Sequence, residues 1–222
     1  MYVIIDTETN GLFDFKKPAD AEGQPRLAEL AMILLDADLN VEAQHQIYIK
    51  PEGWEMTEEA SKTNGLATEI LMEKGRPVSE ALNLYSHFVN QGRIIVAHNA
   101  QYDCKIMRGE LRRAGMPDLF ETTKNICTMR GLVEVCKIPP KGGKGGYKFP
   151  KLSEACVHFD IKLLGDHTAM GDALTVVQLL KRMVQLGVVP EAKVHYAKEA
   201  PERKRETPTP PPTTNLNDID PV

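Results

Sequence analysis

Residues 1–8 read MYVIIDTE, and the interpretation of the whole chain starts from this stretch. The continuous run VII is apolar and β-branched, which predicts a central strand buried on both faces. Side chains alternate along a strand, so Asp6 and Glu8 share one face and Thr7 lies on the other. Two carboxylates about 4 Å apart repel by about 4 kcal/mol at an effective dielectric near 20, unless a cation lies between them. A strand-end acidic pair alone more often marks a solvated edge, but this strand reads as central and predicts a cation site.

The remaining elements follow from hydrophobic periodicity and turn residues. Further strands are predicted at residues 27–36, 44–50, 93–97 and 125–128. Helices are predicted at residues 57–62, 77–90, 99–114, 152–159 and 169–186. Three successive strands, followed by strands that alternate with helices, predict an α/β fold. We expect a mixed five-stranded sheet, with its first three strands antiparallel and helices on both faces.

The composition of the chain changes after Gly187, where prolines accumulate and apolar residues become rare. Residues 1–187 are therefore expected to form one folded domain. Residues 188–222 read as a Pro-rich, disordered tail, because they cannot bury enough apolar surface to offset their ordering entropy. The last eight residues, NLNDIDPV at 215–222, are a candidate linear motif for a protein partner.

The bulk properties exclude some classes of protein. The chain has 222 residues, 42% of them hydrophobic, and contains no apolar run near the ~20 residues of a membrane span. It begins without a signal-peptide pattern, so we expect a cytoplasmic protein without a membrane partner. Its four cysteines lack metal-type spacing and are expected to be buried and reduced. The net charge of −4 is unusual for a nucleic-acid binder, but a site of carboxylates recruits cations that offset it.

Two more acidic residues and a histidine stand at the ends of predicted elements. Asp103 lies in the first turn of the helix that follows the strand RIIVA, and open sheets place their sites at such strand ends. Asp172 lies in the first turns of the last helix, and His167 stands just before that helix, with Thr168 or Asp166 as its cap. Taken singly, each is equally well read as a surface residue, since a helix dipole favours an acidic first turn.

Gly171, beside Asp172, removes a side chain within the last predicted helix. Glycine in a helix costs about 1 kcal/mol relative to alanine. We therefore expect this helix to approach another backbone closely at Gly171.

Together, the carboxylates of Asp6, Glu8, Asp103 and Asp172 predict a site for hard cations such as Mg²⁺ or Mn²⁺ rather than zinc. Two such ions about 3.5–4 Å apart activate a water and stabilise the leaving oxygen in phosphodiester cleavage. A nearby histidine can take the proton of that water, which is the role predicted for His167.

Three motifs resemble those of the DEDDh branch of the DnaQ-like 3′→5′ exonucleases, and the resemblance extends over about residues 1–186. The motifs are Asp6-Thr7-Glu8-Thr9-Asn10-Gly11-Leu12, His98-Asn99-Ala100-Gln101-Tyr102-Asp103 and His167-Thr168-Ala169-Met170-Gly171-Asp172. The resemblance implies a ribonuclease-H-like fold and a catalytic set of four metal ligands and a general base. These are Asp6, Glu8, Asp103 and Asp172 as ligands of two ions, and His167 as the base. Departures from the usual pattern occur at Asn10, Tyr102 and Thr63-Asn64-Gly65-Leu66, none of them a metal ligand.

The resemblance also implies the substrate and its contacts. Residues after the first motif hold the 3′-terminal nucleotide in this family, which maps to Thr9, Gly11 and Leu12, with Leu12 packing on the terminal base. Asn99 is expected near the substrate as well. The implied reaction releases 5′-mononucleotides from single-stranded DNA in proofreading, repair or replication, as in bacterial and bacteriophage relatives. RNA remains an alternative, because the ligands contact only phosphate, and so does a nuclease-fold module tethered to a replication or repair partner.

A basic, glycine-rich segment separates the second and third motifs. Residues 137–151 read KIPPKGGKGGYKFPK, with five lysines, two aromatic residues and no acidic residue. Such a segment is either a solvated loop or a nucleic-acid contact, since single-strand binders combine positive charge with aromatic stacking. The hypothesis is that Lys141, Lys144 and Lys148 contact phosphates upstream of the scissile bond.

Overall fold

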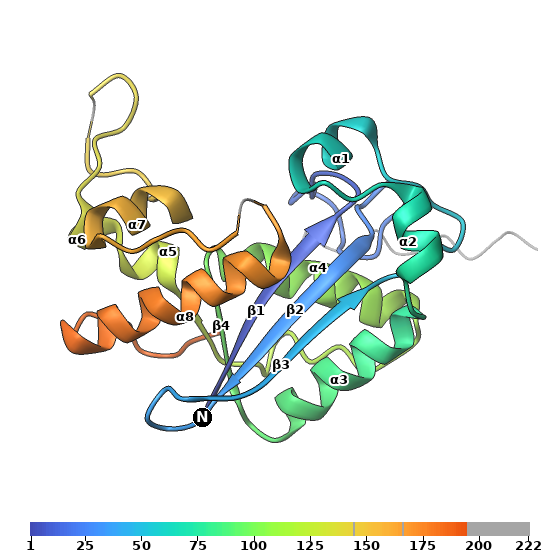
Figure 1. The fold of residues 1–222 in the computed structure, drawn as a ribbon, viewed down its shortest axis with the longest axis horizontal. Helices are drawn as coiled ribbons and strands as arrows, with labels where there is room; N and C mark the ends of the chain where they lie inside the picture. Colours follow the sequence, from blue (N-terminus) through green and yellow to red (C-terminus); the bar gives the residue numbers. More distant parts are fainter. Residues whose placement is uncertain (144, 166, 195–222) are drawn as a thin grey trace, which may run out of the picture.

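The computed structural model describes residues 1–143, 145–165 and 167–194, and its centre is a five-stranded sheet (Figure 1). The strands are β1 Tyr2–Thr9, β2 Leu27–Leu35, β3 Val41–Tyr48, β4 Ile94–Ala97 and β5 Asn125–Cys127, in the order β3-β2-β1-β4-β5. Strands β1, β2 and β3 pair antiparallel, whereas β4 runs parallel to both β1 and β5. The predicted mixed sheet, with its first three strands antiparallel, is confirmed.

Helices fill the connections between the strands. In the described residues they are α1 Glu58–Asn64, α2 Thr68–Lys74, α3 Val78–Asn90, α4 Ala100–Arg113, α5 Thr128–Gly131, α6 Val133–Cys136, α7 Leu152–Phe159 and α8 Ala169–Gln185. The longer helices lie where the sequence predicts them. Helices α2, α5 and α6 were not predicted. Helices α5 and α6 have four residues each, which is too few to show a helical period.

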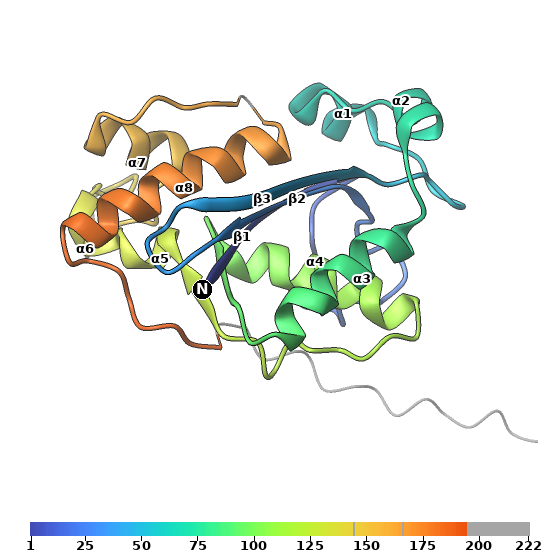
Figure 2. The same ribbon diagram turned by 60° about the horizontal axis from the view of Figure 1, so that its bottom comes forward.

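The sheet is covered on both faces, with α3 and α4 on one side and α8 on the other (Figure 2). Alternate residues of β1 enter different cores: Val3 and Ile5 pack with α3 and α4, and Ile4 packs with α8. Strand β2 alternates in the same way and is buried along its whole length. The face on which a residue of β1 lies therefore determines which helix it meets.

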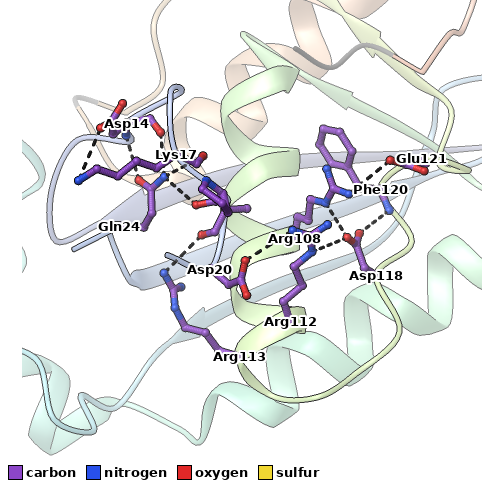
Figure 3. A network of polar contacts seen from close by, with 12 residues as sticks. Asp14, Lys17, Asp20, Gln24, Arg108, Arg112, Arg113, Asp118, Phe120 and Glu121 are labelled. Carbon is purple, nitrogen blue, oxygen red and sulfur yellow. Dashed lines mark hydrogen bonds and ion pairs between the residues drawn. The ribbon is translucent and has the colours of Figure 1, made fainter. Parts of the chain in front are cut away.

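The segment between β1 and β2, residues 10–26, is held against α4 (Figure 3). Within it, Gln24 donates hydrogen bonds to three backbone carbonyls, at 2.8, 3.4 and 3.0 Å. Arg113 of α4 donates to the Ala19 carbonyl at 3.4 Å. Gly109 permits this approach, because a Cβ there would lie 2.5 Å from the Ala19 oxygen. The residues that follow the first motif thus rest on a fixed support.

The chain after α8 returns to the sheet before the described part ends. Lys193 and Asn125 exchange backbone hydrogen bonds of 2.8 and 2.9 Å, and Val189 packs on the α8 core. The folded part therefore extends past the boundary at Gly187 that composition suggests, since so short a contact leaves little signal in the sequence. Residues 195–222, with the candidate partner motif, lie outside the described residues.

Two expectations from composition concern cysteines and membranes. All four cysteines are free thiols, and Cys104, Cys127 and Cys156 are buried as expected, whereas Cys136 is only half-buried. Within the described ranges, no helix combines the length and apolar content that crossing a bilayer requires.

Helix α8 begins with a cap and a close backbone contact. The Thr168 hydroxyl accepts a hydrogen bond from the Gly171 N–H at 3.2 Å, so Thr168 is the cap; the alternative, Asp166, lies outside the described residues. A Cβ at Gly171 would lie 2.4 Å from the Cα of Gly165. The close approach predicted from Gly171 is confirmed, and it sets where the start of α8 lies.

We expect Gly171→Ala to lower the free energy of unfolding by about 1–3 kcal/mol, because the added methyl group has no room against the Gly165 backbone. The gain of about 1 kcal/mol in helix propensity does not offset this overlap. Urea unfolding measures the difference. Gly11→Ala is the matched control, since nothing lies within 4 Å of a Cβ at that position. Equal stability of Gly171→Ala and the wild type would contradict the close packing.

Candidate active site

Three carboxylates converge where β1 ends. Asp6 and Glu8 continue the face of β1 that carries Ile4, so they face α8, and Asp172 lies in the first turn of that helix. Asp6, Glu8 and Asp172 each offer one oxygen, and these oxygens lie within 4.8 Å of one another. The predicted pairing of Asp6 and Glu8 on one strand face is thus matched by a third carboxylate from a helix far along the chain.

Asp103 reaches β1 from the opposite side of the sheet. Thr7 points towards α4, where its backbone N–H and its hydroxyl donate to one Asp103 oxygen at 3.0 and 2.9 Å. Asp103 is buried, and its charge acts on Asp6. The carboxylate of Asp103 therefore stands beside the three-residue group, with its orientation fixed by Thr7.

Burial and mutual repulsion raise the pKa values of these carboxyls. Desolvation raises the pKa of Asp6 well above its ordinary value, and the charges of Asp103 and Asp172 add to the effect. Burial raises the pKa of Glu8 to about 8, and that of Asp103 to about 7 against the opposing hydrogen bonds from Thr7. Anions forced together in this way are stabilised by a cation, and an all-oxygen donor set fits a hard divalent ion. The residues present therefore fit Mg²⁺ or Mn²⁺.

Glu29 is a fifth carboxylate near the site, and it was not predicted from the sequence. It pairs with Glu8 across the β1–β2 ladder and is only 1% exposed. It accepts hydrogen bonds from the Gln46 amide at 2.7 Å and from the backbone N–H of Ala169 at 3.4 Å. Glu29 thus ties β2 to the first residue of α8, the helix that carries Asp172. A single charge within the apolar run LAELAMILL was the signal that could have found it.

His167 lies immediately before the capping residue Thr168, as predicted, with an exposed side chain. Its backbone is in the left-handed region, with φ of 56°. This conformation is uncommon for a residue other than glycine and persists where the surroundings impose it. His167 therefore stands at the same end of α8 as Asp172.

A cleft of about 470 Å³ opens beside Glu8, on the side of α1. It is lined by Thr7, Glu8, Thr9, Gly11, Leu12, Thr57, Glu59, Ala60, Thr63, Asn64 and Tyr102. The Thr9 hydroxyl donates to the Gly11 carbonyl at 2.7 Å and lies 2.8 Å from the Tyr102 hydroxyl. Leu12 is 86% exposed at the edge of the cleft. The structure therefore gathers Thr9, Gly11 and Leu12 around one cavity next to the carboxylates.

Two asparagines differ in their relation to this cleft. The buried amide of Asn64 donates to Glu8 at 3.4 Å and to the Thr9 carbonyl at 3.3 Å, so it supports the Glu8 carboxylate. In the sequence, Asn64 stood out only as a departure from the family pattern. Asn99 precedes α4 in a left-handed conformation, with φ of 76°, and its side chain makes no capping bond. Asn99 is not among the residues that line the cleft.

The basic segment is partly engaged within the protein. Lys148 pairs with Glu154 of α7 at 2.5 and 2.7 Å, whereas Lys141 is exposed. Lys144 lies outside the described residues. Lys148 thus holds the segment on α7, a contact that the sequence alone did not indicate.

We expect the free energy of unfolding of the metal-free protein to fall as the pH rises from about 5 to about 8. Carboxyls titrate near 4 in an unfolded chain, but Glu8 and Asp103 titrate at about 8 and about 7 when folded. The folded state therefore holds more protons across this window, and raising the pH favours the unfolded state. Urea titrations in EDTA at several pH values measure the slope.

Excess Mn²⁺ should reduce this slope, because a bound cation favours the ionised carboxylates of the folded state. Glu8→Gln should reduce the slope without metal. Glu59→Gln, an exposed residue of α1, is the control and should leave it unchanged. Stability of the metal-free wild type that rises with pH over this range would contradict the assigned electrostatics.

The exonuclease family model RNase_T matches residues 3–180 of the chain. Two curated proteins give the relation in sequence. The chain is 25% identical over 198 residues to DNA polymerase III subunit epsilon of Treponema pallidum, which covers 89% of this chain and 79% of that protein. It is 32% identical over 166 residues to ribonuclease T of Haemophilus influenzae, which covers 63% of this chain and 69% of that protein.

Solved structures give the relation in fold. The nuclease domain of 3'hExo, a DEDDh family member bound to rAMP, superposes with a TM-score of 0.66 at 15% identity, covering 86% of this chain and 95% of that domain. E. coli Exonuclease I in complex with a dA16 oligonucleotide gives a TM-score of 0.66 at 18% identity, with 83% of this chain covered but only 40% of that one. At these identities the likeness shows the fold alone. Since the family model covers most of the chain, the protein belongs to the RNase_T exonucleases, a DnaQ-like family.

Proposed function

We propose that this protein is a metal-dependent 3′→5′ exonuclease that hydrolyses single-stranded DNA from its 3′ end and releases 5′-mononucleotides. The observation that carries the proposal is the convergence of Asp6, Glu8 and Asp172 within 4.8 Å beside a cleft of about 470 Å³. That volume lies in the range of small-ligand pockets, so the cleft has room for one nucleotide.

The catalytic roles follow from where the side chains lie. Asp6, Glu8, Asp103 and Asp172 would hold two divalent cations, which would supply charge stabilisation and lower the pKa of an attacking water. Thr7 keeps the Asp103 carboxylate turned towards β1 through two hydrogen bonds. His167, exposed at the start of α8, accepts the proton of the attacking water and passes it to solvent.

The cleft would position the terminal nucleotide. The hydroxyls of Thr9 and Tyr102 and the carbonyl of Gly11 form one hydrogen-bonded group that shapes the wall next to Glu8. Leu12 presents an apolar surface for the terminal base, and its 86% exposure leaves that surface accessible. Asn99 stands at the start of α4, four residues before Asp103, and completes the proposed substrate contacts.

RNA is the second candidate substrate, because one relative is named ribonuclease T. The other relative is named as a DNA polymerase subunit, which favours DNA. Matched 5′-labelled DNA and RNA oligonucleotides of one sequence, incubated with Mg²⁺, separate the two. The proposal expects faster shortening of DNA from the 3′ end, in steps of one nucleotide, with 5′-mononucleotides as products. Internal cleavage, or no shortening of either substrate, would overturn it.

Asp172→Ala should reduce cleavage by about 10³-fold or more, since a lost ligand removes several kcal/mol of charge stabilisation in the transition state. Asp6→Ala should do the same. Glu69→Ala, an exposed acidic residue of α2, is the control and should retain full activity. Rates are measured from single-turnover shortening of a labelled oligonucleotide. Cleavage at wild-type rate by either ligand variant would sink the two-metal assignment.

His167→Ala should lower kcat by about 10²–10⁴-fold through loss of the general base. Mn²⁺ affinity, measured by calorimetry, should stay close to that of the wild type. His158→Ala provides a matched control, because His158 is also an exposed histidine but lies on α7. A decrease of less than about tenfold for His167→Ala would reject the general-base role.

A further inference from the structure

We infer that Arg130 and Phe149 form a second substrate contact, a stacking platform for a base of the single strand upstream of the scissile bond. This inference rests on the proposed function, because it assigns the path of the strand whose 3′ end enters the cleft beside Glu8. Neither residue belongs to the three motifs, and neither lines that cleft.

The Phe149 ring is unusually exposed for an aromatic side chain, at 52%. The guanidinium carbon of Arg130 lies 5.4 Å from the centre of the ring, so the pair combines an aromatic surface with a positive charge. Arg130 is itself exposed. An accessible ring beside a cation is the arrangement with which single-strand binders hold a base and its phosphate.

The platform lies at the edge of the sheet where the carboxylates lie. Strands β1, β4 and β5 are parallel, so their carboxyl ends meet at one edge, and Arg130 follows β5 in α5. Its guanidinium donates to the Gln101 side chain at 2.8 Å, and Gln101 is two residues before Asp103 in the first turn of α4. The platform is therefore linked by one hydrogen bond to the helix that carries a metal ligand.

His98 fixes the chain on one side of Phe149. The His98 Nε2 lies 2.9 Å from the Pro150 carbonyl, which can only accept, so Nε2 carries the proton. Burial lowers the pKa of His98 to about 4, and the neutral ring then accepts at Nδ1 from the Thr128 hydroxyl at 3.0 Å. Pro150 is thereby tied to β4 and to the start of α5, the same elements that flank the site.

Lys148 fixes the chain on the other side of Phe149. Its ammonium group pairs with Glu154, and its backbone N–H donates to the Ile138 carbonyl at 2.9 Å. The exposed ring therefore projects between two anchored residues. A surface held in place before binding loses less conformational entropy when a ligand arrives.

The position of the platform completes a path for the strand. Figure 1 shows residues 145–151 and α1 on opposite sides of the start of α8, and Figure 2 agrees. A strand whose terminal nucleotide occupies the cleft near α1 would pass the carboxylates and continue over Phe149. Lys137, Lys141 and Lys151 of the basic segment are exposed, so the strand would meet positive charge there.

The test compares Phe149→Ala with the wild type on a 12-nucleotide single strand and on a dinucleotide with the same 3′ end. Base stacking on one aromatic side chain changes affinity by about fivefold to 100-fold, so KM on the 12-mer should rise by about tenfold. The preference for the 12-mer over the dinucleotide should fall by the same factor. Phe149→Trp should retain the preference, and Arg130→Gln should reduce it.

Val157→Ala is the control, since Val157 is 82% exposed on α7, and it should leave both KM values unchanged. Removing single bases from the 12-mer locates the contact: at one upstream position the abasic strand should bind the wild type as weakly as Phe149→Ala binds the intact strand. Unchanged KM on the 12-mer in correctly folded Phe149→Ala and Arg130→Gln, or an equal loss on both substrates, would overturn the inference.

Anisotropy of a labelled 12-mer, with Ca²⁺ in place of Mg²⁺, separates this inference from the proposed function. If the wild type binds the strand through Phe149 but cleaves nothing, the nuclease proposal fails and the platform stands. If the wild type cleaves DNA and Phe149→Ala binds as tightly as the wild type, the platform fails alone.

Discussion

The crowding of buried carboxylates at the end of β1 is the constraint on which the rest of the structure depends. Desolvation of Asp6 and electrostatic repulsion from Asp103 and Asp172 raise the pKa of Asp6 well above its ordinary value. A fold selected for stability alone would not gather anions in this way, because each desolvated charge is unfavourable without a partner. Bound divalent cations would make the arrangement favourable, so the architecture and the proposed chemistry would have one origin.

The alternation of β1 distributes the site over the two faces of the sheet. On one face, the side chains of Asp6 and Glu8 point towards α8 and Asp172. On the other face, Thr7 points towards α4 and donates hydrogen bonds to Asp103. Both helices are held by the cores that bury β1, so packing and ligand geometry are coupled. The close contact of Gly171 with Gly165 and the link from Glu29 to the first residue of α8 add to this control.

Much of this arrangement could be predicted from local patterns, because it follows from a period of two or of 3.6 residues. The face shared by Asp6 and Glu8, the presence of the five strands and the place of Asp103 in the first turn of α4 are of this kind. Features that depend on long-range contacts were missed. Glu29 looked like one charge in an apolar strand, and its bond to Ala169 joins residues 140 positions apart.

The absence of a local sequence pattern also explains which features outside the site were not predicted. Helices α5 and α6 are too short to show a period, and the return of Lys193 to Asn125 consists of two backbone bonds that no side-chain pattern encodes. In the basic segment, composition suggested that lysines bind the substrate. In the structure, Lys148 pairs with Glu154 and anchors the segment on α7. The neighbouring ring of Phe149 is exposed and available for a substrate contact.

Calorimetric titration of the metal-free protein with Mn²⁺ near pH 7 tests the central claim most directly. The account predicts two ions bound per chain, with protons released to the buffer as carboxyls of raised pKa ionise. It also predicts that replacing both Asp6 and Asp172 by asparagine removes this binding. Absence of Mn²⁺ binding to the wild type, or binding that survives both substitutions unchanged, would contradict it.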